Sequence, residues 1–149
     1  MAKIVQLDEN LFVSGQIKPE DLPELAQRGI KTIVNNRPDG EDPSGQPYAL
    51  EIEAAAAPLG IDVVNIPFTA QTLTSAEVAE FMSVLESRGA APLLAYCRTG
   101  NRSSMVWAAA RIGQGAPIEE IVGKAMKAGY DLRGAVPFLH NLGKMAALK

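Results

Sequence analysis

An apolar segment that runs directly into a polar loop and then a helix constrains this sequence more than any other feature. Residues 92–96 form a short, wholly apolar run, which is typical of a central parallel strand covered on both faces. A strong helical pattern begins at about Ser103, immediately after the loop. Because parallel strands need crossover connections, usually helices, this segment predicts an α/β domain.

The rest of the chain alternates between the two periodicities. The pattern predicts further strands at 4–7, 11–13, 31–35 and 61–66, and a helix that begins at Pro19 and stops at Gly29. It predicts other helices at 48–58, 74–87, 103–112, 117–128 and 136–148, the second of them opened by a capping box at 74–77. We therefore expect one domain, 1–149, with three layers and a mostly parallel central sheet flanked by helices.

Composition excludes several classes of function. The 149 residues carry a net charge of −3 without a basic stripe, which argues against nucleic acid as a partner. No window approaches the ~18 apolar residues of a membrane span, and no signal peptide is evident at the start, so we expect a cytoplasmic protein. One cysteine and one histidine, His140, exclude an internal disulfide and the usual zinc sets, and we expect no metal or cofactor.

The loop after the apolar strand is where chemistry is expected. Cys97 ends the strand, and the helix that follows offers free N–H groups and the positive end of its dipole. Together with the guanidinium of Arg102, these favour a thiolate, so Cys97 is predicted to be a nucleophile. The alternative is that Cys97 is a small buried hydrophobic residue at a strand end.

The neighbours of Cys97 fit an anion site. Gly100 allows the loop to turn its N–H groups inward, and Arg102 can bind an oxyanion through two bonds. Ser103 is expected to donate a hydrogen bond to the thiolate and to assist its departure. The predicted anion-binding residues are Arg98, Thr99, Gly100, Asn101, Arg102 and Ser103, with Arg37 as an additional contact from another loop.

The loop 97–103 resembles two known active-site loops, those of cysteine-dependent protein phosphatases and of rhodanese-type sulfurtransferases. The segments 11–16, 29–38 and 66–67 resemble the scaffold of dual-specificity phosphatases. The combination is most similar to the bacterial phosphatase-like domain of β-lactamase hydrolase-like proteins, in which segments like 36–41 and 128–131 recur. The resemblance implies hydrolysis of a small anionic substrate, a phosphate monoester, and a functional link to a metallo-β-lactamase-like hydrolase.

Two features depart from the phosphatase pattern. Four residues separate Cys97 from Arg102, as in sulfurtransferases, whereas phosphatases place five there. The loop 68–72 also lacks the aspartate that protonates the leaving group in such phosphatases. Asp39, in the long loop 36–47, is the best candidate for this acid, although it reads equally well as a solvated turn residue. Asp62 is expected at the opposite edge of the sheet and is discounted.

Three functions remain open from the sequence. The first is a phosphatase that works through a phosphocysteine, with Cys97, Arg102, Asp39 and Ser103 as its catalytic residues. The second is a sulfurtransferase that carries a persulfide on Cys97, which the loop length and the missing acid favour. The third is a non-enzymatic module that binds anions or senses oxidants. The oligomeric state is not indicated.

Several other residues are expected to have structural roles. Met105 and Trp107 should be buried against the sheet, and Asp131 should support a corner between helices. His140 is expected to be a surface or half-buried residue of the last helix. Surface positions are predicted for Arg111, Lys124 and Lys127.

Overall fold

A mixed five-stranded sheet forms the centre of the computed structural model, which describes residues 1–148. The strands are β1 (Ile4–Asp8), β2 (Leu11–Ser14), β3 (Thr32–Asn35), β4 (Asp62–Asn65) and β5 (Leu93–Tyr96), in the order β1-β2-β5-β3-β4. The strand β5 is central, and β2, β5, β3 and β4 are all parallel to one another. The predicted parallel sheet is confirmed, with β1 as its one antiparallel strand.

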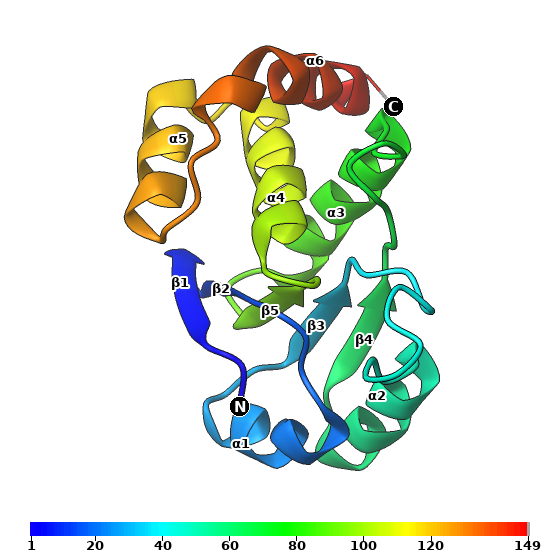
Figure 1. Cartoon of the computed structure of the whole chain (residues 1–149). Helices are drawn as coiled ribbons and strands as arrows, with labels where there is room; N and C mark the ends of the chain where they lie inside the picture. The colour runs from blue at the N-terminus through cyan, green and yellow to red at the C-terminus, as the bar shows by residue number, and fades with distance from the viewer. Residues whose placement is uncertain (149) are drawn as a thin grey trace.

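Helices cover both faces of the sheet (Figure 1). The helices α1 (Leu22–Gln27) and α2 (Ala49–Ala56) lie on one side. The helices α3 (Ser75–Arg88), α4 (Asn101–Gly113), α5 (Ile118–Lys127) and α6 (Val136–Ala147) lie on the other. Short 3-10 turns occur at Pro19–Asp21, Ala57–Leu59 and Arg133–Ala135. The expected three-layer architecture is confirmed.

The central strand β5 is buried on both faces because its side chains alternate between two cores. Leu93 and Ala95 belong to the core formed with α3 to α6, whereas Leu94 and Tyr96 belong to the core formed with α1 and α2. All four are at most 1% exposed. Burying a leucine side chain contributes about 1.5–3 kcal/mol. These contacts therefore hold the end of β5, and with it Cys97, in a fixed position.

A half-buried carboxylate, that of Asp8, links β1 to α4 and α5. Asp8 accepts hydrogen bonds from Lys124 at 2.6 Å, from Arg111 at 3.2 Å and from the indole N–H of Trp107 at 3.2 Å. Arg111 and Lys124 have partly exposed side chains, as expected for surface positions, but both are also paired with this carboxylate, which the sequence did not predict. Trp107 is fully buried as expected.

Replacing Asp8 by asparagine is expected to lower the free energy of unfolding by about 2 kcal/mol at neutral pH, because two cations lose their partner. Burial by itself raises the pKa of Asp8, but the hydrogen bonds and the charge of Lys124 outweigh it and lower this pKa below 3.8. A carboxyl group whose pKa is lower in the native state than in the unfolded state stabilises the fold at pH values above its unfolded pKa. This stabilisation is lost as the pH falls through the native pKa.

Urea unfolding of both proteins at several pH values measures this effect. The difference between wild type and Asp8→Asn should shrink as the pH is lowered below 3.8. The exposed neighbour Glu9 provides a matched control, since Glu9→Gln removes a charge without breaking an ion pair. Equal effects of the two substitutions on the free energy of unfolding at neutral pH would contradict a stabilising role for the ion pairs of Asp8.

Two properties of residues 1–148 bear on other classes of function. None of their helices is both long and apolar enough to cross a membrane. Within the same residues, no cluster of three or more His, Cys, Asp or Glu side chains could hold a metal ion.

Candidate active site

Cys97 lies where β5 ends and the loop to α4 begins. Its side chain is fully buried, and its sulfur is turned toward the loop, because the Gly100 amide donates a hydrogen bond to Sγ at 3.1 Å. Gly100 has a φ of +95° and immediately precedes α4. This left-handed conformation suits glycine, and it occurs at the residue whose N–H donates to the sulfur. Cys97 is therefore buried without being simply a core residue.

The loop is pressed closely against the end of β2. A Cβ atom at Gly15 would lie 2.8 Å from the carbonyl oxygen of Arg98, so only glycine allows this approach. The side chains of Arg98, Thr99 and Asn101 are exposed. The amides of Arg102 and Ser103 fall in the first turn of α4, where a helix offers no internal acceptors for them. The predicted anion-binding residues 98–103 are thus together around Cys97.

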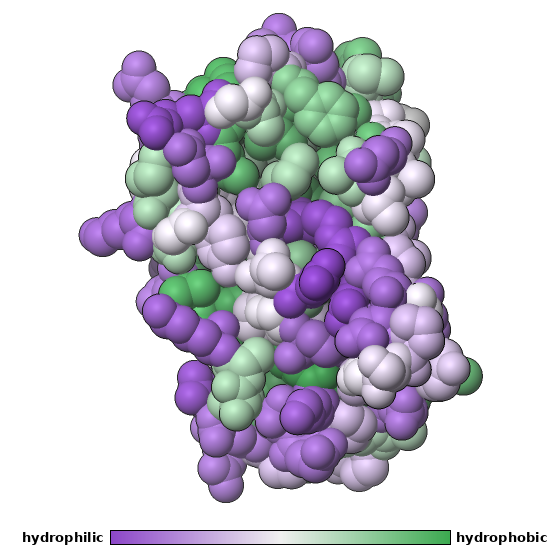
Figure 2. All heavy atoms as spheres, viewed as in Figure 1, coloured by the Kyte–Doolittle hydropathy of each residue, from purple (hydrophilic) through white to green (hydrophobic). Residues whose placement is uncertain are grey.

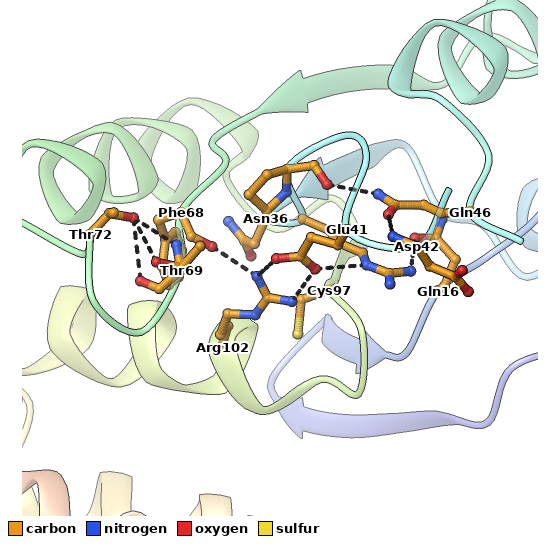
Figure 3. A network of polar contacts seen from close by, with 12 residues as sticks. Gln16, Asn36, Glu41, Asp42, Gln46, Phe68, Thr69, Thr72, Cys97 and Arg102 are labelled. Carbon is orange, nitrogen blue, oxygen red and sulfur yellow. Dashed lines mark hydrogen bonds and ion pairs between the residues drawn. The ribbon is translucent and has the colours of Figure 1, made fainter. Parts of the chain in front are cut away.

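The guanidinium of Arg102 is held by three hydrogen bonds (Figure 3). Its Nη1 and Nη2 donate to the two carboxylate oxygens of Glu41, each at 2.7 Å, and Nη1 also donates to the carbonyl oxygen of Phe68 at 3.0 Å. Arginine has five N–H donors, so two remain, on Nε and Nη2. These two lie along one edge of the guanidinium, which is the arrangement that binds two oxygens of an anion.

Glu41 links Arg102 to a second arginine. Arg37 donates from Nε to Glu41 at 2.9 Å and from Nη1 to the side-chain oxygen of Gln16 at 3.0 Å. Arg37 is buried and makes these two bonds, and its predicted contact with an anion stays a prediction. The two hydrogen bonds from Arg102, together with the one from Arg37, outweigh burial and lower the pKa of Glu41 below 4.5. Glu41 is therefore a carboxylate at neutral pH.

The structure gives Asp39 and Ser103 other partners than the sequence suggests. Asp39 accepts a hydrogen bond from the amide of Ala49 at 2.9 Å, so its carboxylate is engaged at the start of α2. From the same loop it is Glu41, and not Asp39, that contacts Arg102. The hydroxyl of Ser103 donates to Asn36 Oδ1 at 2.8 Å, which replaces the expected bond to Cys97. Asn36 must be the acceptor, because its Nδ2 already donates to the Ile66 carbonyl.

Polar groups from the loops after three neighbouring strands meet at this edge of the sheet. The loop after β3 supplies Asn36 and Glu41, and the loop after β4 supplies the Phe68 carbonyl. Cys97 comes from the loop after β5, and Arg102 from the first turn of α4 that follows it. Figure 2 shows hydrophilic side chains gathered on this face over the ends of β3 and β4. Ligands of open parallel sheets bind outside the carboxyl ends of the strands, so this edge is the candidate site.

Sequence reasoning missed the roles of Glu41, Asn36 and Tyr130. Glu41 could have been found from its place four residues after Arg37 in a long acidic loop. Asn36 is a polar residue directly after a buried strand, which is a weak signal. Tyr130 donates from its hydroxyl to the Thr99 carbonyl at 3.1 Å, and the signal that could have pointed to it is the recurrence of segments like 128–131 in the family that the sequence resembles.

This fold, with a cysteine loop between the central strand and a helix, defines the class of the cysteine-dependent, dual-specificity and tyrosine phosphatase-like proteins. The structure of kinase associated phosphatase shares the fold, with a TM-score of 0.77 over all of this chain and 97% of its own, at 17% identity. The family model described as beta-lactamase hydrolase-like protein, phosphatase-like domain, matches residues 3–115. The chain therefore belongs to this family, as the resemblance in the sequence implied.

Individual relatives agree with this assignment. A beta-lactamase hydrolase-like protein of Agrobacterium fabrum is 38% identical over 102 residues, which are 68% of this chain and 23% of that protein. A candidate phosphatase of Neisseria meningitidis has a crystal structure with a TM-score of 0.78 and 37% identity, covering 93% of this chain and 97% of its own. The chain spans about a quarter to a third of the length of the curated relatives it matches.

Proposed function

We propose that this chain is a cysteine-dependent phosphatase that hydrolyses a phosphate monoester through a phosphocysteine. The thiolate of Cys97 attacks phosphorus, an S–P bond forms, and the ester oxygen leaves with the electron pair of the broken P–O bond. A water molecule then attacks phosphorus, the S–P bond breaks, and phosphate and the thiolate are released. The observation that carries the proposal is the Cys97 sulfur facing the Gly100 amide beside the start of α4.

The anion would be held by the loop and by Arg102. The Gly100 amide, the amides at the start of α4 and the free edge of the guanidinium would supply donors for phosphate oxygens, which gain charge in the transition state. Glu41 and the Phe68 carbonyl fix the guanidinium in the plane that this contact needs. Glu41 also raises the pKa of Arg102 further, so that its charge is retained.

The departure of the leaving group is the step that these residues assist least. Glu41 is ionised, Asp39 is bound at α2, and the loop 68–72 contains no acid. Without a proton donor, the ester oxygen must leave as an anion. We therefore expect kcat/KM to rise steeply as the leaving phenol becomes more acidic, with 4-nitrophenyl phosphate hydrolysed about 10²-fold faster than phenyl phosphate. A series of substituted aryl phosphates measures this dependence.

Glu41→Gln provides the control for this prediction. If Glu41 only aligns Arg102, the substitution slows every substrate by the same factor, about tenfold, because one charge-assisted contact is weakened. If Glu41 were the proton donor, the loss would be confined to the substrates with poor leaving groups. A selective loss of that kind, or equal rates for all aryl phosphates in the wild type, would contradict the prediction that the ester oxygen leaves without a proton donor.

Sulfur transfer is the second candidate, and the four-residue spacing between Cys97 and Arg102 favours it. Here the thiolate attacks the outer sulfur of thiosulfate, the S–S bond breaks, sulfite leaves, and Cys97 becomes a persulfide. A thiol or cyanide would then accept the sulfur. Mass spectrometry after incubation with thiosulfate tests this, because a gain of one sulfur atom on Cys97 is expected for a transferase and none for a phosphatase.

The expected link to a metallo-β-lactamase-like hydrolase stays a prediction.

A further inference from the structure

Tyr130 lies against the outer side of the Cys97 loop, although it is far from the loop in the sequence. It follows α5, and its partly buried ring packs against the core between the sheet and α3 to α6. Its hydroxyl donates to the carbonyl oxygen of Thr99 at 3.1 Å. A Cβ atom at Gly100 would overlap this hydroxyl and would lie 3.0 Å from Cζ of the ring. Gly100 is therefore needed both for its positive φ and for the space that the phenol occupies.

The contact matters because of the peptide group it holds. In a trans peptide the C=O and N–H groups point in opposite directions. In the peptide that joins Thr99 to Gly100, the oxygen accepts from Tyr130, and the N–H donates to Cys97 Sγ at 3.1 Å. Both sides of one peptide plane are thus bonded. Rotation of this plane would break both bonds and turn a carbonyl oxygen toward the sulfur, where it would repel an anion.

We propose that Tyr130 is a positioning residue of the active site, whose hydroxyl holds the 99–100 peptide with its N–H directed at Cys97 and at the bound anion. The effect of Tyr130 on turnover rests on the proposed function, whereas its effect on the orientation of the peptide does not. Burial, and after it the charge of Cys97, raise the pKa of Tyr130 above 10.0, so that the hydroxyl keeps the proton it donates.

Tyr130→Phe removes the hydroxyl and keeps the ring, which makes it the sharpest test. Tyr48→Phe is the matched control, because Tyr48 is 62% exposed at the start of α2. In Tyr130→Phe, amide hydrogen exchange at Gly100 should become about tenfold faster, the equivalent of one hydrogen bond, while the later turns of α4 are unchanged. The dissociation constant of inorganic phosphate, measured by calorimetry, should rise about tenfold and kcat for an aryl phosphate should fall. Tyr48→Phe should change none of these.

Gly100→Ala is a second probe that approaches the same contact from the loop. It should weaken phosphate binding at least as much, because alanine also strains the positive φ, and the loss in the double variant should be smaller than the sum of the two, since the substitutions share one contact. Unchanged exchange and phosphate binding in Tyr130→Phe would overturn the inference and leave the phosphatase proposal intact. Conversely, a wild type that binds phosphate but hydrolyses no ester would refute the phosphatase proposal, while the exchange result still decides the role of Tyr130.

Discussion

Replacing Cys97 by serine is expected to lower kcat/KM for aryl phosphates by about 10⁴-fold or more. A serine hydroxyl is not ionised at neutral pH, and no general base contacts this position in residues 1–148, so the nucleophile is lost. Hydrolysis of 4-nitrophenyl phosphate by reduced protein, compared with Cys97→Ser at equal concentration, measures the effect. Since Cys97 is the single cysteine of the chain, no other thiol can account for residual activity.

The same variant should still bind phosphate. The Gly100 amide and Arg102 remain in place, so the dissociation constant of inorganic phosphate should stay within about threefold of the wild type. Retained binding shows that the variant is folded. A wild type that binds phosphate but turns over neither aryl phosphates nor thiosulfate would favour the third function, a binding module. Full activity of Cys97→Ser would exclude both enzymatic mechanisms.

Arg102→Lys is expected to lower kcat by about 10³-fold, which is the second large effect. Lysine keeps the positive charge, but it cannot donate two parallel hydrogen bonds to an anion while also binding Glu41 and the Phe68 carbonyl. The loss should therefore appear mainly in kcat, since the transition state needs the paired donors more than the ground state does. Steady-state kinetics with 4-nitrophenyl phosphate separates kcat from KM.

Arg111→Lys on the same helix serves as the matched control. It keeps the charge that pairs with Asp8, lies outside the Cys97 loop, and should leave kcat within about twofold of the wild type. If Arg102→Lys were as active as Arg111→Lys, the guanidinium edge would not be the anion contact, and the proposed site would have to be revised.

Much of the fold could be predicted because its signals are local. The uninterrupted apolar run of β5 and the helical pattern after it identify a strand–loop–helix unit with Cys97 at the junction. The capping box of α3 is visible in the sequence and is present in the structure. The Thr74 amide donates to the Glu77 carboxylate, and the Thr74 hydroxyl accepts from an amide of the first turn. Periodicity and capping depend on residues at most four positions apart, so a single sequence contains them.

The contacts that the sequence did not predict join distant segments. Glu41 reaches Arg102 across 61 positions, and Lys124 reaches Asp8 across 116. The choice between Asp39 and Glu41 illustrates the reason. Both are acidic residues of one turn-rich loop, and the path of the loop over the sheet edge decides which carboxylate is directed at Arg102.

The order of the residues thus established where a reactive sulfur would stand and which side chains beside it could bind an anion, because strand, turn and helix follow one another there without interruption. Only the folded chain decided which groups from distant segments lie beside this loop. The guanidinium of Arg102 is bonded by a carboxylate from the loop after a different strand, and the Thr99 carbonyl accepts a hydrogen bond from Tyr130, which follows α5. These decisions depend on distances through space, which the packing of two cores sets and which spacing along the chain does not encode.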